Sequence, residues 1–190
     1  MGLLGGSFNP AHAGHRHIAL FALASLGLDQ VWWLVSPQNP LKPEKGMAPL
    51  AERLAGARAM AKHPRIRVLD IETLLRTRHT VSTLAALRRR FPRCRFVWLM
   101  GADNLIQFPR WKRWTSIFNT VPIAIFARST YSLKGLAGTA ARRFARFRHG
   151  TKPAARLVET KPPAWIFFPS RLHPASATAI RAAREQDGGG

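Results

Sequence analysis

Residues 1–17 read Met-Gly-Leu-Leu-Gly-Gly-Ser-Phe-Asn-Pro-Ala-His-Ala-Gly-His-Arg-His. A short apolar run, Leu3 and Leu4, ends at Gly5-Gly6, and residues 14–26 are apolar almost all round, as in a buried helix. This order predicts a strand, a glycine turn and a helix start. Glycines allow a ligand close to the backbone, and a helix N-terminus presents unpaired N–H groups with a partial positive charge. We therefore expect a phosphate site here.

The spacing of the glycines matches neither G-x-G-x-x-G nor G-x-x-x-x-G-K-[ST], which excludes the usual dinucleotide motif and the P-loop. His12 and His15 stand three residues apart instead, so an opening helical turn places both imidazoles on one side. Each can donate a hydrogen bond to a phosphate oxygen. A single surface histidine would carry little weight, but two at this spacing after a glycine turn favour phosphate chemistry.

The rest of the chain alternates apolar runs with helical segments. Runs of β-branched and aromatic residues predict strands covered on both faces, within residues 31–35, 66–69, 96–100, 122–126 and 165–168. Helices are predicted over 50–63, over 81–91 with Thr80 as N-cap, in the basic region 135–150 and from Ser176 onward; residues 70–79 are expected to be irregular. The pattern predicts an α/β domain with a mainly parallel sheet and a ligand crevice at the strands' carboxyl ends.

Composition limits the class of protein. The chain has 190 residues and 46% hydrophobic residues, which fits one domain spanning residues 1–190. A single cysteine, Cys94, excludes an internal disulfide and favours a reducing, cytoplasmic compartment. No run approaches the roughly 18 apolar residues of a membrane span, and no secretory signal pattern is present, so neither a membrane nor a secreted protein is expected.

The charge is strongly positive. The chain has 30 Lys and Arg residues and nine Asp and Glu residues, which gives a formal net charge of +21. Such a charge attracts anions, either nucleic acid or small phosphorylated substrates. The densest clusters lie within residues 88–95, 110–113 and 142–148. We interpret the first and third as solvated helix faces, since long basic side chains commonly cover such faces.

Three segments resemble one known family. Residues 5–15, Gly-Gly-Ser-Phe-Asn-Pro-Ala-His-Ala-Gly-His, are similar to the pattern G-G-x-F-x-P-x-H-x-G-H of nucleotidyltransferases that share a HIGH-type motif. Residues 101–111, Gly-Ala-Asp-Asn-Leu-Ile-Gln-Phe-Pro-Arg-Trp, resemble G-x-D-N-L followed by F-x-x-W in the nicotinate-mononucleotide adenylyltransferases of that superfamily. Residues 175–181, Ala-Ser-Ala-Thr-Ala-Ile-Arg, resemble the segment I-S-[AS]-T-x-I-R, with alanine in place of the first isoleucine.

The resemblance implies a Rossmann-like three-layer fold and the transfer of the adenylyl group of ATP to nicotinate mononucleotide, giving deamido-NAD and pyrophosphate. The residues that it assigns to catalysis are His12, His15 and Arg181. The ATP-binding residues that it implies are Gly5, Gly6, Ser7, Phe8, His12, His15, Asp103, Ser176, Thr178 and Arg181. The acceptor-binding residues are Asn39, Lys42, His79, Thr80, Asp103 and Trp111. It also implies Mg²⁺ held by substrate phosphates and water, with no protein side chain as ligand.

Several alternatives stay open. The acceptor could be nicotinamide mononucleotide or phosphopantetheine, although residues 101–111 disfavour the second. A basic nucleic-acid-binding module would use the same charge, but Phe144 and Phe147 among arginines are its only hint. A metalloenzyme using His12 and His15 would need a further ligand at suitable spacing, and none accompanies them. The oligomeric state, including a homo-oligomer, is left open, and His79 stands where the family often has tyrosine.

Overall fold

The computed structural model describes residues 1–38, 46–127 and 132–169 of the chain. Its centre is a seven-stranded sheet of order β3-β2-β1-β4-β5-β7-β6, in which every neighbouring pair is parallel. The strands are β1 (Gly2–Gly6), β2 (Val31–Val35), β3 (Ile66–Leu69), β4 (Val97–Gly101), β5 (Ile123–Phe126), β6 (Arg148–His149) and β7 (Trp165–Phe168). The predicted α/β fold with a mainly parallel sheet is confirmed.

The order of the strands reverses beside β1. The chain runs from β1 outward through β2 to β3, then returns to β4 on the other side of β1. Leu3 therefore lies opposite Trp32 of β2 and opposite Trp98 of β4. In an open parallel sheet the ligand crevice forms outside the carboxyl ends of the strands at such a reversal. The fold thus places the crevice after β1 and β4.

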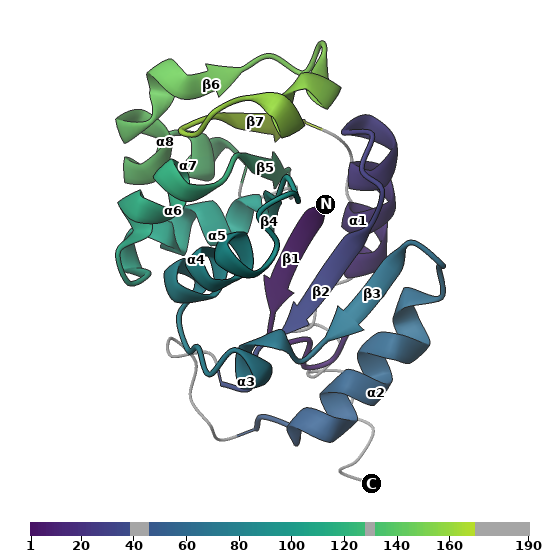
Figure 1. The fold of residues 1–190 in the computed structure, drawn as a ribbon. Helices are drawn as coiled ribbons and strands as arrows, with labels where there is room; N and C mark the ends of the chain where they lie inside the picture. Colours follow the sequence, from purple (N-terminus) through teal and green to yellow (C-terminus); the bar gives the residue numbers. More distant parts are fainter. Residues whose placement is uncertain (39–45, 128–131, 170–190) are drawn as a thin grey trace, which may run out of the picture.

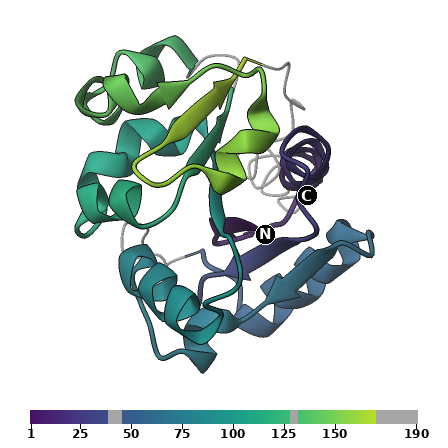
Figure 2. The same cartoon turned by 45° about the horizontal axis from the view of Figure 1, so that its top comes forward.

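Helices cover both faces of the sheet (Figures 1 and 2). One face packs against α1 (Ala13–Ser25) and α2 (Leu50–Ala61), and the other against α4 (Thr80–Arg90), α5 (Ala102–Gln107), α6 (Trp114–Thr120), α7 (Ser132–Leu136) and α8 (Thr139–Arg143). Successive residues of a strand belong to opposite cores: Leu4 packs on the α1 side and Leu3 on the α4 side. Both faces are buried, which explains why the strand sequences do not alternate.

Three local predictions were wrong. Residues 70–79 contain a short helix, α3 (Ile71–Leu74), instead of being wholly irregular. The N-cap of α4 is His79, not Thr80, because the His79 carbonyl accepts the first hydrogen bonds, from the N–H groups of Ser82 and Thr83. The basic region 135–150 is divided into α7, α8, a 3₁₀ turn (Ala145–Phe147) and β6, where one helix was predicted.

The division of the basic region has two physical causes. Gly138 precedes α8 as its N-cap and has an extended backbone (φ −75°, ψ 166°), which ends the helical conformation of α7. Arg148 then pairs with Trp165 of β7, and its guanidinium lies 5.4 Å from the centre of that indole ring. The other 3₁₀ turns are Phe108–Arg110 and Ala154–Glu159.

In the described parts of the chain, no helix combines the length and the apolar character needed to cross a bilayer. The predicted helix from Ser176 lies outside the described residues.

Candidate active site

The turn after β1 is anchored by Phe8. This residue has a left-handed backbone (φ 47°), is only 2% exposed, and stacks on Trp33 of β2 with ring centroids 5.1 Å apart. A left-handed non-glycine residue is uncommon, and here the buried aromatic contact compensates for it. The chain is thereby directed from the end of β1 into the start of α1.

Gly5 has a packing role that the sequence did not indicate. A Cβ atom on Gly5 would overlap the indole ring of Trp98, which packs against the strand at this point. The same indole meets Trp111 edge-on, with ring centroids 6.3 Å apart. Trp98 therefore links the glycine turn to the expected acceptor residue Trp111. A Cβ on Gly6, by contrast, would make only ordinary contact with the Phe8 ring.

His12 and His15 lie together at the start of α1, as their spacing predicts. His12 is the N-cap, and its Nδ1 accepts a hydrogen bond from the Gly14 N–H at 3.1 Å. Nδ1 of His15 accepts from the His12 N–H at 3.2 Å, and the two ring centroids are 3.9 Å apart. An imidazole nitrogen that accepts carries no proton, so the neutral form of each ring has its proton on Nε2. Both rings are thus prepared to donate from Nε2.

Arg53 of α2 is a site residue that the sequence analysis missed. It is 4% exposed, and its guanidinium donates to four backbone carbonyls: Ser7 at 2.8 Å, Ser36 at 2.7 Å, Pro37 at 2.8 Å and Ala48 at 2.8 Å. Burial lowers the pKa of Arg53 from its ordinary value. The sequence signal for it was no more than a charged residue within an alanine-rich helical segment.

Asp103 lies across the strand reversal from the two histidines. It occupies the first turn of α5, directly after β4, whereas His12 and His15 follow the adjacent β1. Gly101 holds the N-cap position of α5, and Asp103 follows it in the first turn of the helix. A carboxylate at this position stabilises the helix N-terminus, and it also faces the end of the sheet where the crevice lies.

The start of α4 forms a second helix N-terminus near the expected acceptor residues. His79 is its N-cap, and burial lowers the pKa of His79, with the positive charges of Lys112 and Arg78 adding to the effect. Trp111 itself is half-buried, with its ring centroid 4.9 Å from that of Phe108.

Five expected site residues lie outside the described residues: Asn39, Lys42, Ser176, Thr178 and Arg181. Among the residues that are described, no three His, Cys, Asp or Glu side chains form a group that could hold a metal ion.

Comparison with known proteins identifies the family of the chain. Residues 3–183 match the family model described as cytidylyltransferase-like. The chain is 57% identical to a probable nicotinate-nucleotide adenylyltransferase of Cereibacter sphaeroides, over 96% of each chain. It is 55% identical to a protein of the same name from Parvibaculum lavamentivorans, over 95% of this chain and 90% of the other.

A solved structure shares the fold. The nicotinic acid mononucleotide adenylyltransferase of Plasmodium falciparum, complexed with NaAD, superposes with a TM-score of 0.68 at 14% identity, over 95% of this chain and 82% of that one. The Rossmann-like arrangement expected from the sequence is thus confirmed. From the match over residues 3–183 and the identity to the two bacterial relatives, we conclude that the chain belongs to the nicotinate-nucleotide adenylyltransferases of the cytidylyltransferase-like family.

Proposed function

We propose that the protein transfers the adenylyl group of ATP to nicotinate mononucleotide, which yields nicotinate adenine dinucleotide (deamido-NAD) and pyrophosphate. The observation that carries the proposal is the pair of imidazoles at the start of α1, beside the strand reversal, in which Nδ1 of each ring accepts a backbone hydrogen bond and Nε2 is the donor nitrogen. The relatives named above support the choice of acceptor.

The reaction needs little covalent chemistry from the protein. An oxygen of the acceptor's 5′-phosphate attacks the α-phosphorus of ATP; a new P–O bond forms, and the bond to the oxygen that bridges to the β-phosphate breaks. Catalysis then depends on alignment and on neutralising charge at the oxygens. His12 and His15 donate from Nε2 to these oxygens, and their Nδ1 hydrogen bonds fix the orientation of the rings.

The remaining ATP contacts follow from position and from the family resemblance. The backbone of residues 5–8 borders the phosphates, and Asp103 accepts hydrogen bonds from ribose hydroxyls. Ser176, Thr178 and Arg181 hold the triphosphate. The N-terminus of α1 and that of the helix predicted from Ser176 would then both contact the triphosphate of ATP.

The acceptor lies on the Trp98 side of the crevice in this proposal. Trp111 stacks on the pyridine ring, and the N–H groups at the start of α4, near His79 and Thr80, receive the nicotinate carboxylate. Asn39 and Lys42 contact the acceptor phosphate.

The residues of this site are compatible with Mg²⁺ that enters bound to the phosphates of ATP. Mg²⁺ prefers oxygen ligands and commonly keeps several waters while it binds substrate phosphates, so it needs no cluster of protein carboxylates. When bound, it neutralises charge on the phosphate oxygens. We also propose a cytoplasmic location, because ATP is the substrate and Cys94 is a free thiol.

Pyrophosphate release tests the proposed function. ATP is offered with nicotinate mononucleotide, nicotinamide mononucleotide or phosphopantetheine in turn, and the first should give the fastest release. No release with any acceptor would refute the proposal.

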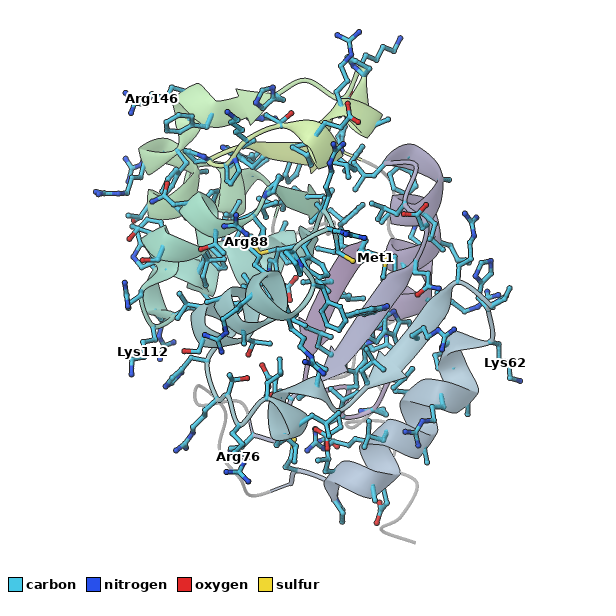
Figure 3. The ribbon with its side chains drawn as sticks, viewed as in Figure 1. Met1, Lys62, Arg76, Arg88, Lys112 and Arg146 are labelled. Carbon is cyan, nitrogen blue, oxygen red and sulfur yellow. The ribbon has the colours of Figure 1, made fainter. Side chains whose placement is uncertain are left out.

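The second candidate, a nucleic-acid-binding module, is disfavoured by where the basic residues lie. In Figure 3, Lys62 lies on the opposite side of the molecule from Lys112 and Arg146, so these basic residues do not form one stripe. We expect DNA or RNA binding to be weak and to fall steeply with added salt. Sequence-selective binding that survives physiological salt would favour this second function instead.

A further inference from the structure

We propose that Arg53 is a positioning residue for adenylyl transfer, which holds the phosphate-binding turn after β1 at a set distance from the end of β2. The proposal rests on the proposed function. Arg53 belongs to α2, and among the described residues its hydrogen bonds reach the site through backbone carbonyls.

The hydrogen bonds of Arg53 join three separate segments. Nη1 bridges the carbonyls of Ser7, in the turn after β1, and Ser36, just after β2. Nη2 binds the Pro37 carbonyl, and Nε binds the Ala48 carbonyl. All four distances are 2.7–2.8 Å, short enough for strong bonds from a charged donor. A planar guanidinium has a fixed fork of donors, so it sets the relative position of the carbonyls as well as binding them.

A second residue supports the same connection from the turn. Nδ2 of Asn9 donates to the Gly46 carbonyl at 2.9 Å, and the Ala48 N–H donates to Oδ1 of Asn9 at 3.2 Å. The β1–β2 pairing also continues past the strand ends, since the Ser36 N–H binds the Gly6 carbonyl at 2.9 Å. The turn after β1 is therefore bound to the end of β2 through Gly6 and to residues 46–48 through Asn9, and Arg53 binds carbonyls in both of these regions.

Stability alone is a poor reason for this arginine. Within the described parts of the chain, its guanidinium donates to backbone carbonyls and to no carboxylate, and burying a cation without a salt bridge is costly. Apolar side chains of similar volume often stabilise a protein at least as well as a buried charge. The carbonyls that Arg53 binds all lie in segments next to the candidate site. In these segments a shift of the backbone would change the alignment of ATP with the acceptor.

Alignment should affect turnover more than binding. An in-line attack depends on the distance between the acceptor oxygen and the α-phosphorus, and a displacement of about 1 Å can lower the rate by roughly a hundredfold. Loss of Arg53 should therefore lower kcat by about 10- to 100-fold, while the KM values for ATP and nicotinate mononucleotide change by less than about threefold.

The test compares Arg53→Met, which removes all donors, with Arg53→Lys, which keeps the charge. Arg16→Met is the matched control, because Arg16 makes one bond from Nε to a backbone carbonyl, that of Ala61, at the other end of α2. Kinetics are measured well below the melting temperature of each variant. Hydrogen exchange is followed in peptides that cover residues 5–11 and 36–38.

We expect a large loss of kcat in Arg53→Met, a smaller one in Arg53→Lys, and faster exchange in both peptides; Arg16→Met should match the wild type in all of these. If Arg53→Met does not fold, Arg53→Lys carries the comparison. A folded variant with wild-type kcat and unchanged exchange would overturn the inference, as would a loss explained by the folded fraction alone. An inactive wild type would refute the proposed function instead, and the exchange data would still decide whether Arg53 holds the turn.

Discussion

Replacing His15 by alanine separates a catalytic role from a capping role. In the structure, Nδ1 of His15 accepts the His12 N–H, while Nε2 is the nitrogen that can donate to a phosphate oxygen. Alanine removes both interactions. Losing one preorganised donor to developing charge typically lowers kcat by about 10²–10³, or roughly 2.7–4 kcal/mol, and this is the loss that we expect.

The effect on folding should be much smaller. The lost hydrogen bond near a helix start costs about 1 kcal/mol, and the lost ring contact with Phe8, whose centroid lies 4.6 Å away, costs roughly 0.5–1.5 kcal/mol more. Together these lower the melting temperature by roughly 3–10 °C for a chain of this size. With a typical stability of about 5–15 kcal/mol, the variant stays almost wholly folded at 25 °C. A hundredfold fall in turnover therefore cannot come from unfolding.

The assay is steady-state pyrophosphate release, run beside a thermal melt of each variant. His17→Ala is the matched control, because His17 lies on the same helix but its ring packs near Phe21, with centroids 6.3 Å apart. Turnover within about threefold of the wild type in folded His15→Ala would refute the assigned role, since the expected loss is at least about a hundredfold. An equal loss in His17→Ala would do the same.

Three further predictions concern packing, pH and substrate choice. Gly5→Ala should destabilise the fold by about 1–3 kcal/mol through its clash with Trp98, and a melting temperature equal to that of the wild type would contradict this. Burial raises the pKa of Glu72, so the folded state binds more protons than the unfolded state, and the stability of the wild type falls as pH rises from about 4 to about 8. Glu72→Gln keeps an acceptor for the Thr83 hydroxyl and carries no charge, so its melting temperature should rise relative to the wild type over the same pH range. A difference in melting temperature that does not change with pH would exclude a cost of ionising Glu72. The kcat/KM for nicotinate mononucleotide should exceed that for nicotinamide mononucleotide by at least about tenfold, roughly 1.4 kcal/mol, because a carboxylate accepts hydrogen bonds from helix N–H groups more strongly than a carboxamide does. Trp111→Ala should lower the kcat/KM for both acceptors by the same factor. Equal efficiencies of the two acceptors in the wild type would argue against the carboxylate site.

Much of the architecture was predictable because its causes are local. Strands such as β2 and β7 are continuous apolar runs, and burial on both faces of a parallel sheet requires that pattern. His12 and His15 were expected on one side of a helix start because helical geometry relates residues three apart, and the contact between their rings confirms it. The sequence alone is therefore enough to predict the fold class, the position of the glycine turn and the histidine pair.

The tertiary structure decided the features that depend on distant partners. Arg53 binds the Ser7 carbonyl across 46 positions of sequence, and no local pattern marks that contact. Gly5 is required by the Trp98 ring on a neighbouring strand, and β6 exists because Arg148 meets Trp165. Short-range periodicity reports which face of an element is buried, whereas the choice among buried partners depends on how whole elements pack.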